Sequence, residues 1–312
     1  MTTSMDQYFI GRTYKKLEEL AAQNPKDKIE FVYFVDEKID HKDDHKKDDA
    51  PDLSHLIINN STFSNIGFKK TKALQCDFSF CVFINCYFKW ADFQQVKFQS
   101  CEFINCNFEH ATFIGCDFQY AEFSGCYIPY AAIKSNLPHE RENINRSLCR
   151  TLSIQCLQLG AVEDYKQYLF EERNAGEIHA IRKLFHSSTS YYKKYSLLDG
   201  LEGLLYYIRS KGSKFLWGYG EKMGVLVRNI LLVILAYAVV YSPSVSTIVV
   251  DPITSNRFLS AVYLSTCTFF SGSINLHTLS STLQMVILSE HVVGAILVGF
   301  FGAALFRQIN RR

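Results

Sequence analysis

Phenylalanine recurs at every fifth position over a long stretch of the chain, and this spacing restricts the fold more than any other feature. It occupies positions 63 and 68 and every fifth position from 78 to 123, with Leu74 shifting the grid once. From Cys76 onward, a small residue lies two positions before each phenylalanine, and Val96 is the largest of these. Neither the period of a helix nor that of a flat strand would place both columns on one side. A coil with five residues on each side does.

A longer repeat supports a coil with four sides. The segment "CVFINCYFKWADF" (81–93) matches "CEFINCNFEHATF" (101–113) at eight of thirteen positions, offset by twenty residues. Twenty residues are four sides of five, so successive coils place like residues above like, about 4.8 Å apart. Cys81 is then expected under Cys101, and Phe83 under Phe103.

The central Phe or Leu, with a small residue two positions before it, resembles the pentapeptide-repeat family over residues 61–133. The resemblance implies a right-handed quadrilateral β-helix of three to four coils, which we assign to residues 61–135. Seven of the ten cysteines fall on the small column. They are interpreted as core filler, with a metal site or disulfides as alternatives. Zinc needs four ligands that converge on one point, whereas these thiols form parallel columns, so no metal site is predicted.

Residues 1–60 are predicted to form an N-terminal strand and a charged linker. The strand is "KIEFVYFVDEKI" (28–39), and the linker is "DHKDDHKKDDAPD" (40–52). His41 and His45 lie among aspartates there, which leaves weak metal binding as the alternative to a solvated loop. The first sixteen residues lack an apolar core long enough for a secretory signal, so the polar part of the chain is expected in the cytosol.

Helical spacing predicts a helical, juxtamembrane linker over residues 136–221. Its last part mixes leucine, tyrosine and basic residues, which suits either a helix at a membrane surface or an ordinary core helix. A Gly-Tyr-Gly sequence occurs at 218–220. It precedes the first apolar run, so it is not interpreted as a potassium filter.

Residues 222–312 are predicted to form a membrane domain. Val225–Ser242 and Leu283–Phe306 are long enough to cross a bilayer, whereas Arg257–Phe270 is too short and suits a re-entrant helix capped by Asn256. Lys and Arg concentrate before the first span and after the second, while the connecting loop holds only Arg257 and Asp251. Both termini are therefore expected to be cytoplasmic, in a multi-pass protein of the inner membrane.

This order, with "LSTCTFF" (264–270) and the C-terminal "SEHVVGAILVGFFGAALFRQINRR", is similar to the two-transmembrane potassium-channel-like pore domain. The "WGYGE" before the first span is similar to the segment that joins pentapeptide repeats to such a pore in a bacterial fusion family. The resemblance implies a homotetramer with Gly294 as a gating hinge. The expected pore and filter residues are Thr266, Thr268, Phe269, Phe270, Ser271, Gly272 and Ser273.

The filter departs from the family pattern Thr-Val-Gly-Tyr-Gly-Asp. Phe270 replaces a glycine that needs positive φ, and Ser273 replaces the acidic residue at the mouth. The helix ends near Phe270 favour cations, whereas Arg257 and the missing acidic ring remove the usual amplification of cation preference and could admit anions. A weak cation preference without potassium selectivity is predicted.

Glu290 and His291 interrupt the second span. A carboxylate there should face protein or water and have a partner. Two interpretations stay open: a structural hydrogen bond to the short pore helix, and a proton sensor that gates the pore.

Two functions are compatible with these features, and a third lacks support. The first is a tetrameric ion channel with a cytosolic regulatory or assembly solenoid, whose partners are ions, lipid and other copies of itself. The second is a membrane-anchored interaction scaffold with a non-conducting pore-like region. The third, DNA mimicry, needs a strongly acidic face. Residues 61–133 hold five lysines against six acids, so no nucleic-acid role is expected. No catalytic arrangement and no cofactor are predicted.

Overall fold

The computed structural model describes residues 8, 11–17, 19–20, 28–37, 52–185, 191–244, 256–270 and 280–310. The chain divides into two compact units, Met1–Leu204 and Leu205–Arg312. The strands are β1 (Thr13–Tyr14), β2 (Ile29–Glu30), β3 (Val32–Val35), β4 (Asp52–Ser54), β5 (Ile58–Asn59), β6 (Thr62–Ser64), β7 (Lys72–Leu74), β8 (Val82–Ile84), β9 (Asp92–Gln94), β10 (Glu102–Ile104), β11 (Thr112–Ile114) and β12 (Glu122–Ser124). The α-helices are α2 (Tyr130–Ile133), α3 (Glu142–Gln158), α4 (Val162–Leu184), α5 (Leu197–Trp217), α6 (Met223–Tyr241), α8 (Arg257–Phe269) and α9 (Ser281–Ile309).

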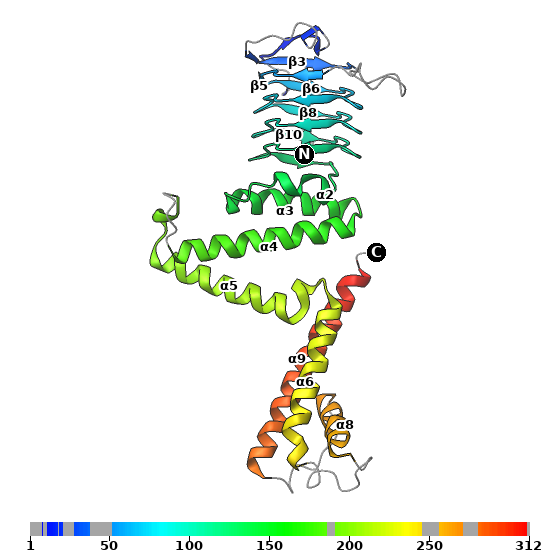
Figure 1. Ribbon diagram of the computed structural model, residues 1–312, viewed down its shortest axis with the longest axis vertical. Coiled ribbons are helices and arrows are strands. Elements are labelled where there is room, and N and C mark those ends of the chain that lie inside the picture. Colours follow the sequence, from blue (N-terminus) through cyan, green and yellow to red (C-terminus); the bar gives the residue numbers. More distant parts are fainter. Residues whose placement is uncertain are drawn as a thin grey trace. The chain divides into compact units, whose positions relative to one another are not determined.

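The first unit is a parallel β-solenoid of about four coils, with strands stacked as rungs (Figure 1). One face is the six-stranded sheet β1-β3-β6-β8-β10-β12, and another is the four-stranded sheet β11-β9-β7-β4. Phe63 pairs with Phe83, Phe83 with Phe103, and Phe103 with Phe123, each at an offset of twenty residues. The predicted coil length and register are confirmed.

The phenylalanines form ladders of parallel rings inside the solenoid. The ring centroids of Phe63 and Phe83 are 4.6 Å apart, those of Phe83 and Phe103 5.0 Å, and those of Phe103 and Phe123 4.9 Å. All four side chains are buried. Each ring therefore packs on the one below it at about the strand spacing, which explains why the period is so strict.

The predicted shift of the grid at Leu74 is wrong. Ala73 occupies the central position of β7, pairs with Leu53 and Phe93 and is buried, whereas Leu74 is 41% exposed. Successive side chains of a strand point to opposite faces, so the residue after the central one lies on the outer face of the coil whatever its size. The five-residue register continues without interruption through an alanine.

At the corners of the solenoid, one residue per side adopts the left-handed backbone conformation. The non-glycine residues at positions 60 to 110, in steps of five, and Tyr120 have φ between 51° and 62°, and Gly115 and Gly125 have φ of 66° and 63°. A single residue in this conformation turns the chain sharply enough to begin the next side. Asn85 Nδ2 also donates to Asn65 Oδ1 of the preceding coil, at 3.2 Å, so part of one corner column is hydrogen-bonded.

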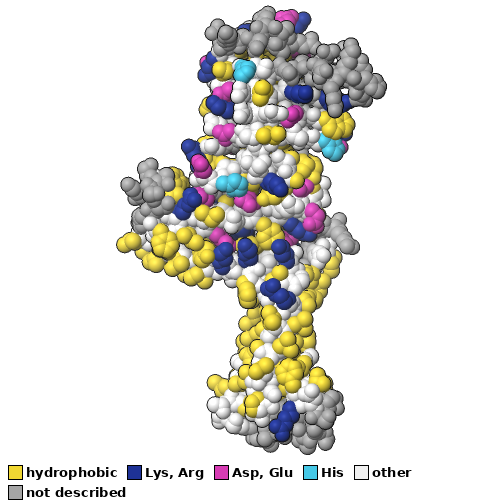
Figure 2. Space-filling model, viewed as in Figure 1, with side chains coloured by type: hydrophobic (Ala, Val, Ile, Leu, Met, Phe, Trp, Pro, Cys, Tyr) yellow, Lys and Arg dark blue, Asp and Glu magenta, His cyan; other side chains and the backbone are white. Residues whose placement is uncertain are grey.

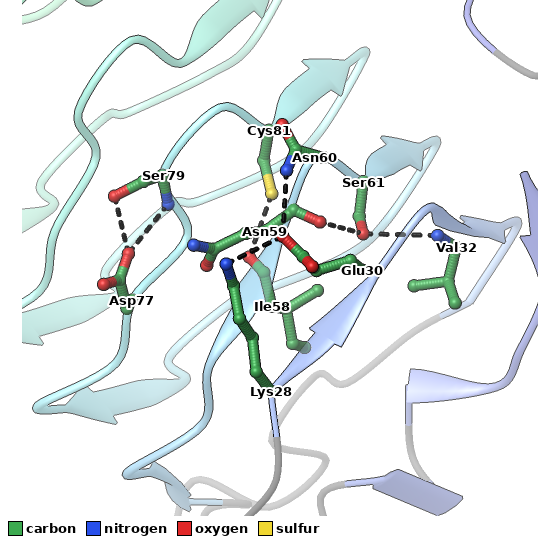
Figure 3. Close-up of polar contacts among 10 residues, drawn as sticks. All are labelled: Lys28, Glu30, Val32, Ile58, Asn59, Asn60, Ser61, Asp77, Ser79 and Cys81. Atoms are coloured by element: carbon green, nitrogen blue, oxygen red, sulfur yellow. Dashed lines mark hydrogen bonds and ion pairs between the residues drawn. The ribbon is translucent and has the colours of Figure 1, made fainter.

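The stack begins before residue 61. The predicted strand at 28–39 forms β2 and β3, and β3 pairs with β6, with the Phe34 ring 4.8 Å from that of Phe63. Glu30 accepts hydrogen bonds from Lys28 and Asn60 at this end (Figure 3). The first strands are thus rungs of the solenoid. The charged stretch with His41 and His45 lies outside the described residues.

The column cysteines fill the corners beside the phenylalanine rings, as the packing interpretation predicts. All seven are buried, and their thiols donate to backbone carbonyls, for example Cys81 Sγ to Ile58 O at 3.1 Å (Figure 3) and Cys101 Sγ to Phe78 O at 2.9 Å. Burial raises the pKa of Cys81 to about 12. The thiol form, which is a weak nucleophile, is therefore favoured at neutral pH.

Helices α3 and α4 close the C-terminal end of the solenoid. Leu148, Leu152 and Tyr168 belong to the same buried cluster as the phenylalanine ladders. Gly125 N donates to Gln155 Oε1 at 2.7 Å, and the Tyr168 hydroxyl donates to Ile128 O at 2.9 Å. The region predicted as a linker therefore packs in part as a cap that covers the last coil.

In the second unit, α8 packs against both α6 and α9. Two described helical segments, Met223–Ser244 and Ser281–Ile309, are long and apolar enough to cross a membrane, with mean hydropathies of 2.3 and 1.9. They correspond to the two predicted spans. The thirteen-residue α8 corresponds to the predicted short helix.

Candidate functional site

The short helix α8 begins at a side-chain cap. The Asn256 side chain accepts a hydrogen bond from the backbone N–H of Phe258 at 3.0 Å, as the sequence predicts. This bond satisfies one of the backbone donors that the first turn of a helix leaves without a partner. Ala261 and Leu264 of α8 pack with Ala238 of α6 and Ile287 of α9 in one buried cluster.

The C-terminal end of α8 lies against α9 at Gly294. A Cβ atom on Gly294 would lie 2.3 Å from the carbonyl oxygen of Phe269, which is far inside van der Waals contact. Phe269 itself packs with Leu226, Ile234 and Leu297 in a second buried cluster. The absence of a side chain at Gly294 is therefore what allows α8 to approach α9 closely. A role as a gating hinge stays a prediction.

Glu290 joins all three helices. Its side chain is fully buried, and the Tyr241 hydroxyl at the end of α6 donates to Oε2 at 2.6 Å. The Ser265 hydroxyl of α8 lies 2.5 Å from Glu290 Oε1 and 2.9 Å from the carbonyl oxygen of Ile234. The carboxyl group is thus hydrogen-bonded to the short helix, which is the geometry that the structural interpretation of Glu290 requires.

His291 is less buried than its neighbour Glu290 and lacks comparable hydrogen bonds in the part of the chain that the structure describes. Its side chain is half-buried, and ring atom Nδ1 is buried without a hydrogen-bond partner among the described residues. Tyr237 of α6 and Ser289 of α9 share a hydrogen bond of 3.0 Å. Ser289 therefore bonds α9 to α6, whereas Glu290 bonds it to both other helices.

The described part of the expected filter divides into buried and exposed residues. Thr268 and Phe269 are buried within the chain, and the Thr268 hydroxyl donates to Leu264 O at 2.9 Å. Their side chains therefore do not reach the surface of this chain. Thr266 is half-buried, with its hydroxyl donating to Val262 O, and Phe270 is 63% exposed. Ser271, Gly272 and Ser273 lie outside the described residues.

The Gly-Tyr-Gly sequence is a turn between α5 and α6. Gly218, Tyr219 and Gly220 have φ of 58°, 59° and 81°, and all three are buried. Arg307, near the end of α9, lies beside this turn, with Nη2 3.5 Å from Glu221 Oε1 and Nη1 donating to Tyr219 O at 3.4 Å. The motif therefore connects helices and ties them to the end of α9.

Large apolar side chains cover α6 and α9 (Figure 2). Water-soluble monomers rarely expose apolar patches of more than a few hundred Å². This surface suits lipid or further copies of the chain. The exposed residues include Leu231, Leu235, Val239, Met285, Leu288, Val292 and Phe306.

Comparison with known proteins addresses the solenoid only. The family described as pentapeptide repeats matches residues 61–99 and 91–127, with eight copies of the repeat. No curated protein matches the chain. Solved structures that it resembles include two trypsin-treated variants of QnrB1, a plasmid-mediated fluoroquinolone resistance protein, at 22% and 23% identity, with TM-scores of 0.16 and 0.12. The similarity covers 33% of this chain and 56% of those chains, so the chain spans about half of their length. The β-solenoid of this chain is a pentapeptide-repeat domain.

Proposed function

We propose that the protein is an ion channel of the potassium-channel-like superfamily, assembled from four copies of the chain. The observation that carries the proposal is the packing of a short helix, α8, against two helices of membrane-spanning length. The Gly294–Phe269 contact and the Glu290 hydrogen bonds support it further, because they hold α8 at one depth beside α9. Irregular backbone inside a bilayer needs protein or water around it, which a re-entrant helix beside a pore provides.

Assembly is supported by the apolar surface of α6 and α9. Two spans from one chain cannot enclose a pore, so several chains must surround it. Met285, Leu288 and Val292 lie on exposed positions of α9, where neighbouring copies or an inner cavity would meet them. Closed rotational symmetry around one axis is the usual solution for such identical copies.

The proposed pore prefers cations weakly and discriminates little between potassium and sodium. Phe270 is exposed at the end of α8, so an aromatic side chain is available at the pore constriction. The C-terminal ends of the four α8 helices would bring partial negative charge towards the axis. A full charge at the outer mouth acts through about 8 Å of screening at physiological salt, so the helix ends are expected to dominate at the constriction.

The solenoid serves in this proposal as a cytosolic assembly or regulatory domain, and both termini lie on the cytoplasmic side of the inner membrane. Basic residues lie at the start of α6, with Lys222 just before it and Arg228 within it, and in the last turn of α9, at Arg307. This distribution supports the orientation. The expected partners are permeant ions, lipid and three further copies of the chain.

A membrane-anchored scaffold is the second candidate. It is favoured by aromatic side chains that are exposed at the corners of the solenoid, Phe80, Trp90 and Tyr120, where a partner protein could bind. In this case α6 and α9 would anchor the chain without conducting ions.

The deciding experiment is current recording from the purified protein in a planar bilayer under asymmetric salts. We expect conduction, with a reversal potential between those of non-selective conduction and ideal cation selectivity. A reversal potential at the potassium value in mixed potassium and sodium would contradict the expected selectivity, and one near chloride would reverse its sign. A tetramer without conduction would favour the scaffold. A monomer or dimer in detergent would remove the basis for a pore.

A further inference from the structure

Helix α5 has two opposite faces. On one face Gly200 and Gly203 are buried against the end of α4, where a Cβ on Gly203 would lie 2.8 Å from the carbonyl oxygen of Ala180. This face is made of small residues because the two backbones approach each other closely. The exposed leucines of α5 lie on the other face.

That other face is an exposed apolar stripe. Its members lie within an arc about 100° wide on a helical wheel, as on a helix that buries one side. Those of the N-terminal half are 53–77% exposed, and Figure 2 shows hydrophobic side chains gathered over this part of α5. The stripe consists of Leu197, Leu198, Leu201, Leu205, Ile208, Phe215 and Leu216.

Basic residues border the stripe. Arg209 flanks it on one edge and Lys211 on the other, and Lys214 lies beyond Lys211. Arg209 and Lys214 are exposed. Long basic side chains can keep their charge in water while their stems cover apolar surface. An apolar stripe with basic edges suits a surface of apolar chains beneath negatively charged groups.

The C-terminal end of α5 is bonded to α6. The Asn229 side chain donates to the carbonyl oxygens of Phe215 and Leu216, at 2.6 and 3.0 Å. Asn229 lies six residues after the start of α6 at Met223, which is about 9 Å along a helix. If α6 enters the bilayer at its first residue, α5 therefore ends within the depth to which interfacial helices bury their apolar face, about 5–10 Å into the headgroup and acyl boundary.

An apolar groove continues from the stripe. It lies between the end of α5, α6 and α9, has a volume of about 340 Å³ and is lined by residues that include Phe215, Leu232, Val233, Ile296 and Phe300. The exposed Arg228 lies beside it, with its guanidinium 3.3–3.4 Å from Asn229 Oδ1. A groove of this kind can hold an acyl chain with an anionic headgroup near Arg228.

We propose that α5 lies in the cytosolic interface of the membrane and binds anionic phospholipid, with its apolar stripe among the acyl chains and its basic residues at the headgroups. This inference rests on the proposed membrane function, because it requires α6 to cross the bilayer. It makes α5 a lipid-dependent connection between the end of α4 and the first span.

The test uses the full-length protein in nanodiscs, with Cys267→Ser as background and one introduced cysteine that carries a polarity-sensitive fluorophore. Leu205→Cys reports on the stripe, and Glu202→Cys, which is also exposed but lies outside the stripe, is the matched control. Leu235→Cys on the exposed surface of α6 reports on the span itself. Quenching is measured with brominated lipid and with aqueous iodide, in phosphatidylglycerol and in phosphatidylcholine discs.

We expect brominated lipid to quench the label at position 205 at least five-fold more than the label at 202, and more strongly in phosphatidylglycerol. Arg209→Glu with Lys214→Glu should remove the difference between the two lipids. Equal iodide quenching at 205 and 202, with lipid quenching at 235, would overturn the inference and leave the span intact. A label at 205 protected from both quenchers would show that protein covers the stripe, which also overturns it. Loss of lipid quenching at 235 would instead contradict the proposed membrane function.

Discussion

In the solenoid the phenylalanine and small-residue columns point inward, whereas on α6 and α9 many large apolar side chains are exposed. The solenoid core is made of many equivalent ring contacts, such as Phe83 between Phe63 and Phe103. The position of α8 depends on a few unequal contacts, among them Gly294 with Phe269 and Glu290 with Ser265. A repeated core specifies the fold through periodicity, whereas the helical unit specifies it through individual residues.

The largest effect is expected where the repeated core receives a charge. Phe103→Asp places a carboxylate between two stacked rings and should cost at least about 5 kcal/mol, because it adds the burial of a charge to the loss of a core ring. Ile114→Asp is the control, since Ile114 is exposed at the end of β11, on another face of the solenoid. Thermal unfolding followed by circular dichroism should show loss of the solenoid for Phe103→Asp only. Unchanged stability of Phe103→Asp would contradict the coil register.

Glu290 tests the dependence of α8 on single contacts. Glu290→Ala leaves the buried Tyr241 hydroxyl without its acceptor and opens a cavity, so the second unit should lose about 3 kcal/mol. Glu290→Gln keeps an acceptor and should lose less. Tetramer content in detergent and the pH dependence of current separate the two interpretations. A Glu290→Gln protein that assembles normally but conducts without pH dependence would favour gating, whereas loss of the tetramer would favour the structural role.

Gly294→Ala sharpens the comparison with a single methyl group. The new Cβ meets backbone at Phe269 that cannot rotate away, so we expect a loss of about 2 kcal/mol in the second unit. Gly299→Ala is the matched control on the same helix, because its Cβ would meet nothing within 4 Å. Helix propensity alone should make that variant slightly more stable. Equal unfolding temperatures for the two alanine variants would show that α8 does not need the close approach.

The smallest expected effect is on the pH dependence of stability of the helices that close the solenoid. The ring of His179 is hydrogen-bonded at Nδ1 to the Tyr192 hydroxyl, which donates to the buried Glu142. Burial, aided by Lys183, lowers the pKa of His179 from 6.5 to about 4. The unfolded chain therefore binds a proton between these pH values that the folded chain does not, so stability present above pH 6.5 is lost as the pH falls towards 4.

His179→Gln should weaken this dependence. The unfolding temperature is measured at pH 7.5 and pH 5 for the variant and the unchanged protein, and the variant should lose less on acidification. An identical loss in both proteins would assign the acid sensitivity to other groups.

The solenoid could be predicted from sequence because the same residue types, phenylalanine and a small residue, recur at every fifth position. The corners show where this stopped: Asn65, Asn85 and Gly115 hint at positive φ, but Phe80 and Trp90 adopt it too, against their usual preference. The prediction at β7 was wrong because Leu74 is more hydrophobic than Ala73. Strand alternation, and not hydrophobicity, decides that Ala73 is the central, buried residue. The rung at β3 was identified as a strand, but its stacking on β6 depends on a contact across an intervening segment that carries no repeat.

The helical unit could be predicted only in outline. Length and hydropathy identify α6, α8 and α9, and Asn256 identifies the start of α8. Tyr241 and Ser265 were not foreseen as partners of Glu290, since they lie 49 and 25 residues away along the chain. A hydroxyl on an apolar helix is the signal that was available, because it needs an acceptor inside the protein. Burial of Thr268 and Phe269 depends on the orientation of α8 about its own axis, which is fixed by its contacts with α6 and α9 and not by its sequence alone.

Because each coil has twenty residues in the same register, the solenoid can be shortened or lengthened only by whole coils. Since residues 81–93 and 101–113 occupy equivalent places in successive coils, removal of residues 81–100 would connect Phe80 to Cys101. Phe78 would then take the place of Phe98, with which it already stacks. The rod would shorten by one strand spacing, about 4.8 Å, and its two ends would keep their orientation about the axis. Insertion of a coil would lengthen it by the same amount. Duplication of one coil in the gene would therefore change the distance between the two ends of the domain by one strand spacing, without any change to the surfaces at those ends.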